Sequence, residues 1–181
     1  MPKLSTHRHI ALVGFSGSGK STIGPLLARR MKRAFIDTDQ QIERRTKLSV
    51  ADIFAKRGEL AFRRLEQTEV RKACQSGSSS VIALGGGALL NRANLKVILQ
   101  NAIVIHLRCS HRELMRRLIS KADRPLLRGA RPVLESRVRT LMAARLPGYQ
   151  KAEFAISVSS GNKREIVAAI LKRLERYHGA R

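Results

Sequence analysis

The sequence contains few cysteines, few aromatic residues and few acidic residues, and each shortage argues against a class of protein. Only Cys74 and Cys109 are present, far apart and without a C-x-x-C spacing or a nearby group of histidines. This pattern speaks against a disulfide framework and against a zinc site. We therefore expect two reduced, buried thiols.

Aromatic residues make up 4% of the chain, and tryptophan is absent. Proteins that bind single-stranded nucleic acid stack the bases on aromatic side chains, and the sequence shows no recognised nucleic-acid-binding motif. We therefore expect no specific nucleic-acid partner.

Long apolar runs are also missing, since none approaches the ~20 residues of a membrane span. Only about nine residues precede the first predicted strand, fewer than a signal or transit peptide requires. We therefore expect a cytoplasmic protein that does not bind membranes. At 181 residues and 43% hydrophobic residues, the chain has the length of one domain, 1–181, with a core of about 9–177.

Positive charge, by contrast, is in large excess. Lys and Arg number 36 against 13 Asp and Glu, a net charge of +23, and no acidic residue precedes Asp37. Much of the excess lies in segments with a helical pattern, where it is typical of a solvated face. The surplus also predicts weak, salt-sensitive association of a monomeric protein with polyanions.

The most informative segment is 14–21, Gly-Phe-Ser-Gly-Ser-Gly-Lys-Ser, which matches the phosphate-loop pattern G-x-x-x-x-G-K-[ST]. Its glycines allow bare backbone N–H groups to surround an anion, and the helix that follows adds its positive dipole end. Lys20 then reaches the β and γ phosphates, and Ser21 offers a hydroxyl to Mg²⁺. The predicted ligand is a nucleoside triphosphate. The predicted nucleotide-binding residues in this region are Gly14, Gly17, Ser18, Gly19, Lys20, Ser21 and Thr22.

Five apolar runs of strand length alternate with helical patterns, which predicts an α/β fold with a five-stranded parallel sheet flanked by helices. Between the runs, Asn91 is a candidate helix cap and Ser110-x-x-Glu113 a candidate capping box. Ile166, Ile170 and Leu174 have helical spacing. The predicted strands are 10–13, 34–36, 81–84, 103–107 and 154–158.

Ligands of such sheets bind beyond the carboxyl ends of the strands. Asp37-Thr38-Asp39 follows the second predicted strand, where the carboxylates could serve Mg²⁺ and an attacking hydroxyl, or simply form a turn and a helix cap. Gly85-Gly86-Gly87 follows the third and would allow a ligand to approach the backbone closely. The charged segment 121–132 has the composition of a mobile lid.

Taken together, these motifs resemble the shikimate kinase family, a group of P-loop enzymes related to nucleoside monophosphate kinases. The resemblance runs from about Ile10 to Leu174 and implies a three-layer sandwich with a mobile lid. The motifs that carry it are the phosphate loop, Phe35-Ile36-Asp37-Thr38-Asp39, Ile53-Phe54, Gly58-Glu59, Phe62-Arg63-Arg64-x-Glu66, Ala83-Leu84-Gly85-Gly86-Gly87, Arg124-Pro125-Leu126-Leu127 and Arg145-Leu146-Pro147-Gly148-Tyr149.

The resemblance implies ATP-dependent phosphorylation of the 3-hydroxyl of shikimate in aromatic amino-acid biosynthesis, with Mg²⁺ as cofactor. Lys20 would hold the phosphates, while Ser21 and Asp37 would bind the metal. Arg124 would steady the transferred phosphoryl group from the lid. Arg117 would stack on adenine, although its neighbour Arg116 is equally well placed in the sequence.

On the acceptor side, the resemblance implies that Asp39 binds substrate hydroxyls and acts as the base. Arg63 and Arg145 would bind the shikimate carboxylate through two parallel hydrogen bonds each. Gly86 is the strongest candidate for a backbone contact, and residues of about 40–76 would form the substrate-binding helices. The predicted substrate-binding residues are Asp39, Arg63, Gly85, Gly86, Gly87 and Arg145.

Three alternatives remain open. Asn162-Lys163-Arg164-Glu165 imitates the guanine-reading motif of GTPases, with Glu in place of Asp. A gluconate-type sugar-acid kinase would share the phosphate loop and an anionic polyol substrate. A non-catalytic regulatory domain of the same family should lack the catalytic carboxylates. We assign no adenine contact within 159–163.

Overall fold

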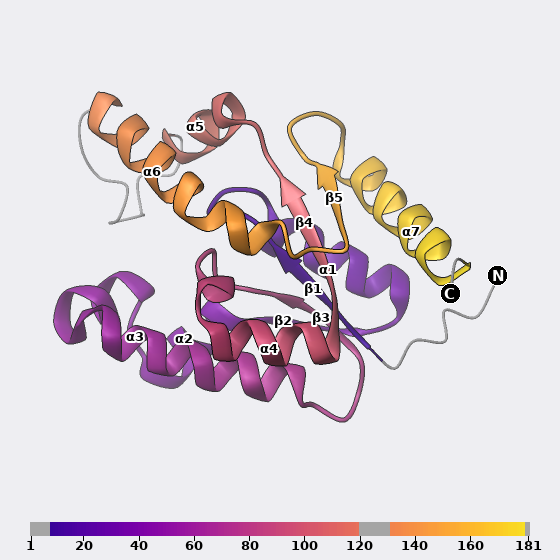
Figure 1. Cartoon of the computed structure of the whole chain (residues 1–181), viewed down its shortest axis with the longest axis horizontal. Coiled ribbons are helices and arrows are strands. Elements are labelled where there is room, and N and C mark those ends of the chain that lie inside the picture. Colours follow the sequence, from indigo (N-terminus) through magenta and orange to yellow (C-terminus); the bar gives the residue numbers. More distant parts are fainter. Residues whose placement is uncertain (1–7, 120–130, 180–181) are drawn as a thin grey trace.

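The computed structural model describes residues 8–119 and 131–179, which form an α/β sandwich around one parallel sheet (Figure 1). The strand order is β2-β3-β1-β4-β5, and every neighbouring pair is parallel. The predicted parallel sheet and its five strands are therefore confirmed, with small shifts at the strand ends. The strands are β1 (His9–Val13), β2 (Ala34–Asp37), β3 (Ser80–Ala83), β4 (Ala102–Arg108) and β5 (Phe154–Ser157).

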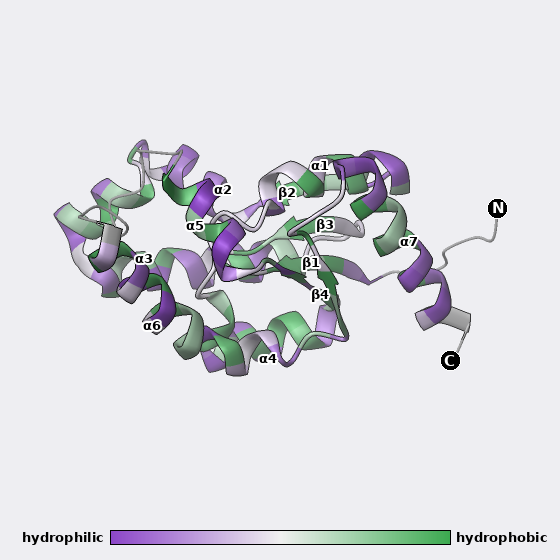
Figure 2. Ribbon diagram, turned by 90° about the horizontal axis from the view of Figure 1, so that it is seen from above, coloured by the Kyte–Doolittle hydropathy of each residue, from purple (hydrophilic) through white to green (hydrophobic). Residues whose placement is uncertain are grey.

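Helices cover both faces of this sheet, as Figure 2 shows with α1 on one side and α4 on the other. Among the described residues, no helix is both long and apolar enough to cross a membrane. The helices are α1 (Lys20–Met31), α2 (Thr38–Thr46), α3 (Val50–Cys74), η1 (Ala88–Leu90), α4 (Arg92–Asn101), α5 (His111–Ile119), α6 (Arg131–Tyr149) and α7 (Lys163–Gly179).

The central strand β1 shows why the sheet needs two covering layers. All five of its residues are buried, and successive side chains point to opposite faces. Ile10 and Leu12 belong to the core that includes residues of α1 and α7, whereas Ala11 and Val13 belong to the core with residues of α3 and α4. A continuous apolar run is what a strand buried on both faces requires.

The helix signals read from the sequence are borne out in most cases. Asn91 caps α4 by accepting hydrogen bonds from the N–H groups of Ala93 and Asn94, and Ile166 of α7 is buried as its spacing predicted. The capping box at Ser110 is only half formed. Ser110 Oγ accepts from the Glu113 N–H at 3.3 Å, but the Glu113 carboxylate binds Arg116 and Arg117 instead of returning to Ser110.

The long helix α3 is broken at Gly58, whose φ of 77° and ψ of 171° lie in a region open almost only to glycine. Residues on both sides of the break, Ile53 before it and Phe62 after it, pack with Ile42 of α2 in a small separate core. Together α2 and α3 span the segment of about 40–76, in which we predicted the substrate-binding helices, and that role stays a prediction. Phe62 and Arg63 lie about one helical turn after this break.

Both cysteines are free and buried, as we expected. Burial raises the pKa of the Cys74 thiol to about 11. This thiol is therefore protonated and unreactive at neutral pH.

Candidate active site

The phosphate loop joins β1 to α1 and has the backbone shape that its glycines permit. Gly14, Gly17 and Gly19 have φ values of 148°, 87° and 94°. A Cβ on Gly14 would lie 2.7 Å from the Leu107 carbonyl oxygen. Gly19 is the N-cap of α1 and no side chain caps this helix, so its first N–H groups are left to an anion.

Lys20 lies back across the loop that precedes it. Its Nζ donates to the carbonyl oxygens of Gly14 at 2.8 Å and Phe15 at 3.2 Å. Ser18 is buried, and its Oγ has no hydrogen-bond partner among the described residues. Thr22, in the first turn of α1, donates its N–H to the Gly19 carbonyl oxygen. A cation and a free hydroxyl thus border the anion cradle.

Asp37 both caps a helix and contacts the phosphate loop, so the two interpretations of its sequence position, a helix cap and a metal ligand, are compatible. Its Oδ1 caps α2 by accepting from the N–H groups of Asp39 and Gln40. Its Oδ2 accepts from Ser21 Oγ at 2.7 Å. A hydroxyl and a carboxylate oxygen side by side at the phosphate loop are ligands that suit Mg²⁺, which usually binds through one or two carboxylates together with substrate phosphates.

The structure separates the neighbours Arg116 and Arg117 of α5. Arg117 donates to the carbonyl oxygens of Gly17 at 3.3 Å and Val158 at 2.7 Å, and its side chain is 28% exposed. Arg116 pairs with Glu113 and is 72% exposed. Arg117 is therefore the arginine that borders the phosphate loop. Its predicted stacking on adenine stays a prediction.

Asn162 and Glu165 form the helix cap of α7. Asn162 Oδ1 accepts from the N–H groups of Arg164 and Glu165, while the Glu165 carboxylate accepts from the Asn162 backbone N–H at 3.1 Å. Asn162 Nδ2 donates to Glu165 as well, at 2.7 Å. The segment that imitates a guanine-reading motif is thus a reciprocal capping box.

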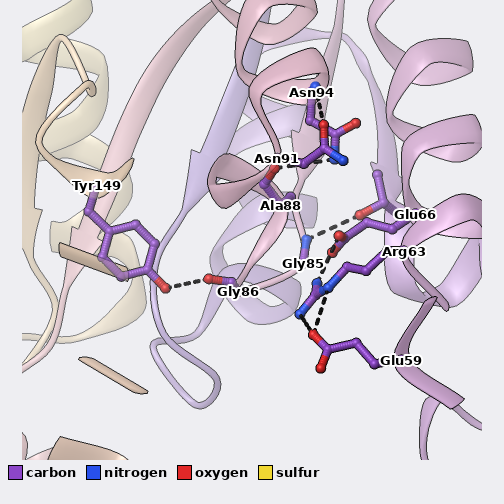
Figure 3. A network of polar contacts seen from close by, with 10 residues as sticks. Glu59, Arg63, Glu66, Gly85, Gly86, Ala88, Asn91, Asn94 and Tyr149 are labelled. Carbon is purple, nitrogen blue, oxygen red and sulfur yellow. Dashed lines mark hydrogen bonds and ion pairs between the residues drawn. The ribbon is translucent and has the colours of Figure 1, made fainter. Parts of the chain in front are cut away.

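The three glycines after β3, residues 85–87, are the meeting point of the predicted acceptor residues. Figure 3 shows Gly85, Gly86 and Arg63 in this region, which we call the glycine turn. A Cβ on Gly85 would lie 2.8 Å from Asp39 Oδ1. One on Gly86 would lie 2.7 Å from Arg145 Nη1, and one on Gly87 would lie 3.1 Å from Arg63 Nη1. Residues distant in the sequence therefore converge on three consecutive glycines, each of which leaves room for one of them.

Arg63 is held by two carboxylates. Its Nε and Nη2 donate to Glu59 Oε1, and its Nη1 donates to Glu66 Oε2 at 2.9 Å (Figure 3). Glu66 is 1% exposed, and its other oxygen, Oε1, has no hydrogen-bond partner among the described residues. Burial raises the pKa of Glu66, whereas Arg63 acts in the opposite direction. Sequence reasoning gave Glu66 no role, although its spacing of three residues from Arg63 is a signal for a helical ion pair.

Arg145 reaches the same place from α6. Its guanidinium lies 5.0 Å from the centroid of the Phe15 ring, a cation–π arrangement that ties α6 to the phosphate loop. Its Nε is buried without a hydrogen-bond partner among the described residues. A buried, unpaired N–H is costly, so an acceptor supplied by a ligand would relieve it.

Asp39 approaches Gly85 from the first turn of α2. Its Oδ1 is buried and has no partner among the described residues. Burial raises the pKa of Asp39 to about 6, while the nearby Lys20 acts to lower it. Oxygens of Asp39 and Glu66 both lie next to Gly85, so two acceptors face one small space.

The predicted lid, 121–132, falls almost entirely outside the described residues. Arg124 lies outside them as well, so its role stays a prediction. Arg131 and Pro132, which we placed in the lid, are the first residues of α6.

A parallel sheet with a phosphate loop at the end of its central strand, and with α2, α3 and the glycines 85–87 beside that loop, defines a P-loop kinase of the nucleoside-monophosphate-kinase type. The chain belongs to the shikimate kinase family, whose family model, described as shikimate kinase, matches residues 16–175.

Individual relatives agree with this assignment. The shikimate kinase of Chlorobium limicola is 42% identical over 156 residues, which cover 83% of this chain and 78% of that protein. The solved structure of shikimate kinase from Acinetobacter baumannii in complex with shikimate superposes with a TM-score of 0.89 at 32% identity, covering 96% of each chain. A gluconokinase from Sinorhizobium meliloti has a TM-score of 0.56 at 19% identity, covering 94% of this chain and 93% of that one, which shows a common fold only.

Proposed function

We propose that this enzyme transfers the γ-phosphoryl group of ATP to the 3-hydroxyl of shikimate, giving shikimate 3-phosphate and ADP. The reaction belongs to the biosynthesis of aromatic amino acids. The observation that carries the proposal is the convergence of a carboxylate and two guanidinium groups, from Asp39, Arg63 and Arg145, on the glycines 85–87. An acidic polyol needs acceptors for its hydroxyls and cations for its carboxylate, and this pocket offers both.

On the nucleotide side, the loop N–H groups and Lys20 hold the phosphates, and Arg117 lies beside the base. Ser21 and Asp37 would hold Mg²⁺, which fits their adjacent oxygens. The ion would neutralise charge on the β and γ phosphates as the bond to ADP breaks. Arg124 would add a further positive charge there.

On the acceptor side, Arg63 and Arg145 bind the carboxylate of shikimate and so fix the ring. Asp39 Oδ1 accepts a hydrogen bond from the 3-hydroxyl and takes its proton as the oxygen forms a bond to the γ-phosphorus. ADP departs with the electrons of the broken P–O bond. Alignment of this kind makes the transfer effectively intramolecular.

A gluconate-type kinase is the second candidate, since gluconate is also an anionic polyol and a gluconokinase has the same fold. A regulatory, non-catalytic domain is less well supported, because Lys20, Asp37 and Asp39 are all in place. We further propose that the enzyme is a cytoplasmic monomer.

A coupled ADP-release assay with the purified protein tests these proposals. We expect Mg²⁺-dependent ADP release with shikimate well above the rates with gluconate or without an acceptor. A higher rate with gluconate would establish the second candidate instead. ATP binding without any acceptor-dependent ADP release would favour the regulatory alternative.

A further inference from the structure

Tyr149, the last residue of α6, connects the glycine turn with strand β4 and with the hydrophobic core. Its hydroxyl donates to the Gly86 carbonyl oxygen at 2.7 Å (Figure 3). Its ring is 7% exposed, belongs to the core that includes Val13 and Leu84, and stacks on the His106 ring at 4.7 Å. The hydroxyl is thus carried on a ring that the sheet holds in place, and it reaches out to the glycine turn.

The helix end is also pressed against the turn by its backbone. A Cβ on Gly148 would lie 2.9 Å from the Leu89 Cβ, so only glycine allows this close approach. Arg145, one helical turn before Tyr149, faces Gly86. Burial raises the pKa of the Tyr149 phenol to about 12, although Arg145 acts against this. The phenol is therefore protonated and remains a donor at any physiological pH.

Fixing one carbonyl fixes a whole peptide group. The Gly86–Gly87 peptide bond is trans, so the Gly86 carbonyl and the Gly87 N–H point in opposite directions. Two other N–H groups of the turn are already used, since the Gly85 N–H donates to Thr38 Oγ1 and the Ala88 N–H to the Gly85 carbonyl oxygen. No residue that the structure describes accepts from the Gly86 or the Gly87 N–H. Gly87 itself borders Arg63, since a Cβ there would lie 3.1 Å from Arg63 Nη1.

We infer that Tyr149 is a positioning residue for the acceptor substrate: its hydroxyl holds the Gly86 carbonyl, and this directs the Gly87 N–H away from α6 and toward the acceptor pocket. Because Tyr149 and Arg145 share one helical turn, the same contact keeps the Arg145 guanidinium in register with the turn. This inference rests on the proposed function, since shikimate is the acceptor that the Gly87 N–H would meet.

The test is Tyr149→Phe, which keeps the ring and its stacking but removes the hydroxyl. The matched control is Tyr177→Phe, the same change at the other tyrosine of the chain, on α7. We expect Tyr149→Phe to raise KM for shikimate about 5- to 20-fold, the effect of one lost hydrogen bond with a buried carbonyl left unpaired. KM for ATP should change less than twofold, and Tyr177→Phe should leave both values within twofold.

Each other outcome has its own meaning. An unchanged KM for shikimate in Tyr149→Phe would overturn the positioning role. Equal losses for shikimate and ATP, together with a lower Tm, would also overturn it and leave Tyr149 as a core residue. If the unaltered enzyme fails to phosphorylate shikimate, the proposed function fails first and the inference with it. ATP affinity, measured with a fluorescent nucleotide, shows whether each variant is folded.

Discussion

At the scale of single residues, the two arginines that we propose to bind the acceptor are held in place by their neighbours. Glu59 and Glu66 orient Arg63, and Phe15 lies under Arg145. The protein has therefore met part of the cost of ordering these long side chains before substrate arrives. A planar guanidinium in a fixed position can make two parallel hydrogen bonds to a carboxylate, which an ammonium group cannot.

We predict that Arg63→Lys and Arg145→Lys each raise KM for shikimate by about 10- to 100-fold, as expected for a charge-assisted hydrogen-bond pair lost in a partly buried site. Steady-state kinetics with each substrate varied in turn measures the effect. KM for ATP should stay within about threefold of its normal value. Arg64→Lys, at the exposed neighbouring position on α3, is the matched control and should behave like the unaltered enzyme. Loss of ATP binding with intact shikimate binding would show that the carboxylate assignment is wrong.

A second prediction concerns His106, whose pKa is lowered to about 4 chiefly by burial and also by Arg108 and Lys20. Between pH 6.5 and 4 the unfolded chain binds a proton at this histidine and the folded chain does not, so the free energy of unfolding must fall as the pH falls. We expect the unaltered enzyme to lose about 1–2 kcal/mol more than His106→Phe between pH 7.5 and 5, allowing for partial exposure. Urea unfolding at both pH values measures this. Parallel losses in the two proteins would contradict the assignment.

The roles of single residues were harder to predict from the sequence than the strands and helices. The phosphate loop, Asp39, Arg63 and Arg145 could be named because they lie in ordered motifs. Glu66 and Tyr149 could not be given roles, because their contacts with the glycine turn depend on side chains meeting across elements. One sequence contains no record of such long-range contacts.

At the scale of elements, the residue that caps the N-terminus of α2 also contacts the first turn of α1, directly after the phosphate loop. One oxygen of Asp37 caps the helix, and the other accepts from Ser21. The proposed metal binding is therefore linked to helix stability through one carboxylate.

Substitution of Asp37 can separate helix capping from the proposed metal binding, because Asn caps helices about as well as Asp but carries no charge. We predict that Asp37→Asn stays within about 0.5 kcal/mol of the normal free energy of unfolding but needs several-fold more Mg²⁺ for half-maximal activity. Asp37→Ala should lose about 1 kcal/mol as well. Urea unfolding and Mg²⁺ titration of the rate provide the two readouts. An unchanged Mg²⁺ requirement in both variants would remove Asp37 from the metal site.

The cap of α7 supports a fourth prediction. Asn162→Ala removes the cap that receives the N–H groups of Arg164 and Glu165, so we expect a loss of about 1 kcal/mol in thermal or urea unfolding. The ratio of activity with ATP to that with GTP should not change. A shift of this ratio toward either nucleotide would show that Asn162 contacts the base after all.

The sequence was a good guide to which elements exist and a poorer guide to where they end. Apolar runs predicted all five strands. Burial on both faces demands such runs in the three inner strands, whereas the edge strands β2 and β5 are partly exposed. The break of α3 at Gly58 was not foreseen, since a glycine within a helical pattern is as compatible with a continuous helix as with a kink. The half-formed box at Ser110 has a similar cause, because Glu113 has competing arginine partners four residues or fewer away.

At the scale of the whole molecule, the charge of +23 far exceeds what two anionic substrates require. Part of the surplus lies on α1 and α7, which contact each other. Arg29 and Arg30 are exposed near the end of α1, and Lys172 and Arg176 are exposed near the end of α7. The whole chain contains 36 Lys and Arg residues, and 25 of them are arginine, the side chain best suited to binding phosphate.

We predict that the enzyme binds heparin at low ionic strength and that log Kd rises linearly with log salt concentration. The double change Lys172→Glu with Arg176→Glu should weaken this binding several-fold without altering activity. Its matched control is Arg92→Glu with Lys96→Glu, an equally spaced exposed pair on α4, which should weaken it less. Affinity that is the same at low and high salt would reject the idea.

The glycine turn after β3 also has a consequence for how this enzyme could change its substrate. Because three adjacent positions each accommodate a group from a different helix, inserting or deleting one residue there would disturb all the proposed acceptor contacts together. Gradual adaptation to a new alcohol is therefore open mainly through the side chains of α3 and α6. The turn itself should tolerate almost no variation, whether in a laboratory library or over generations.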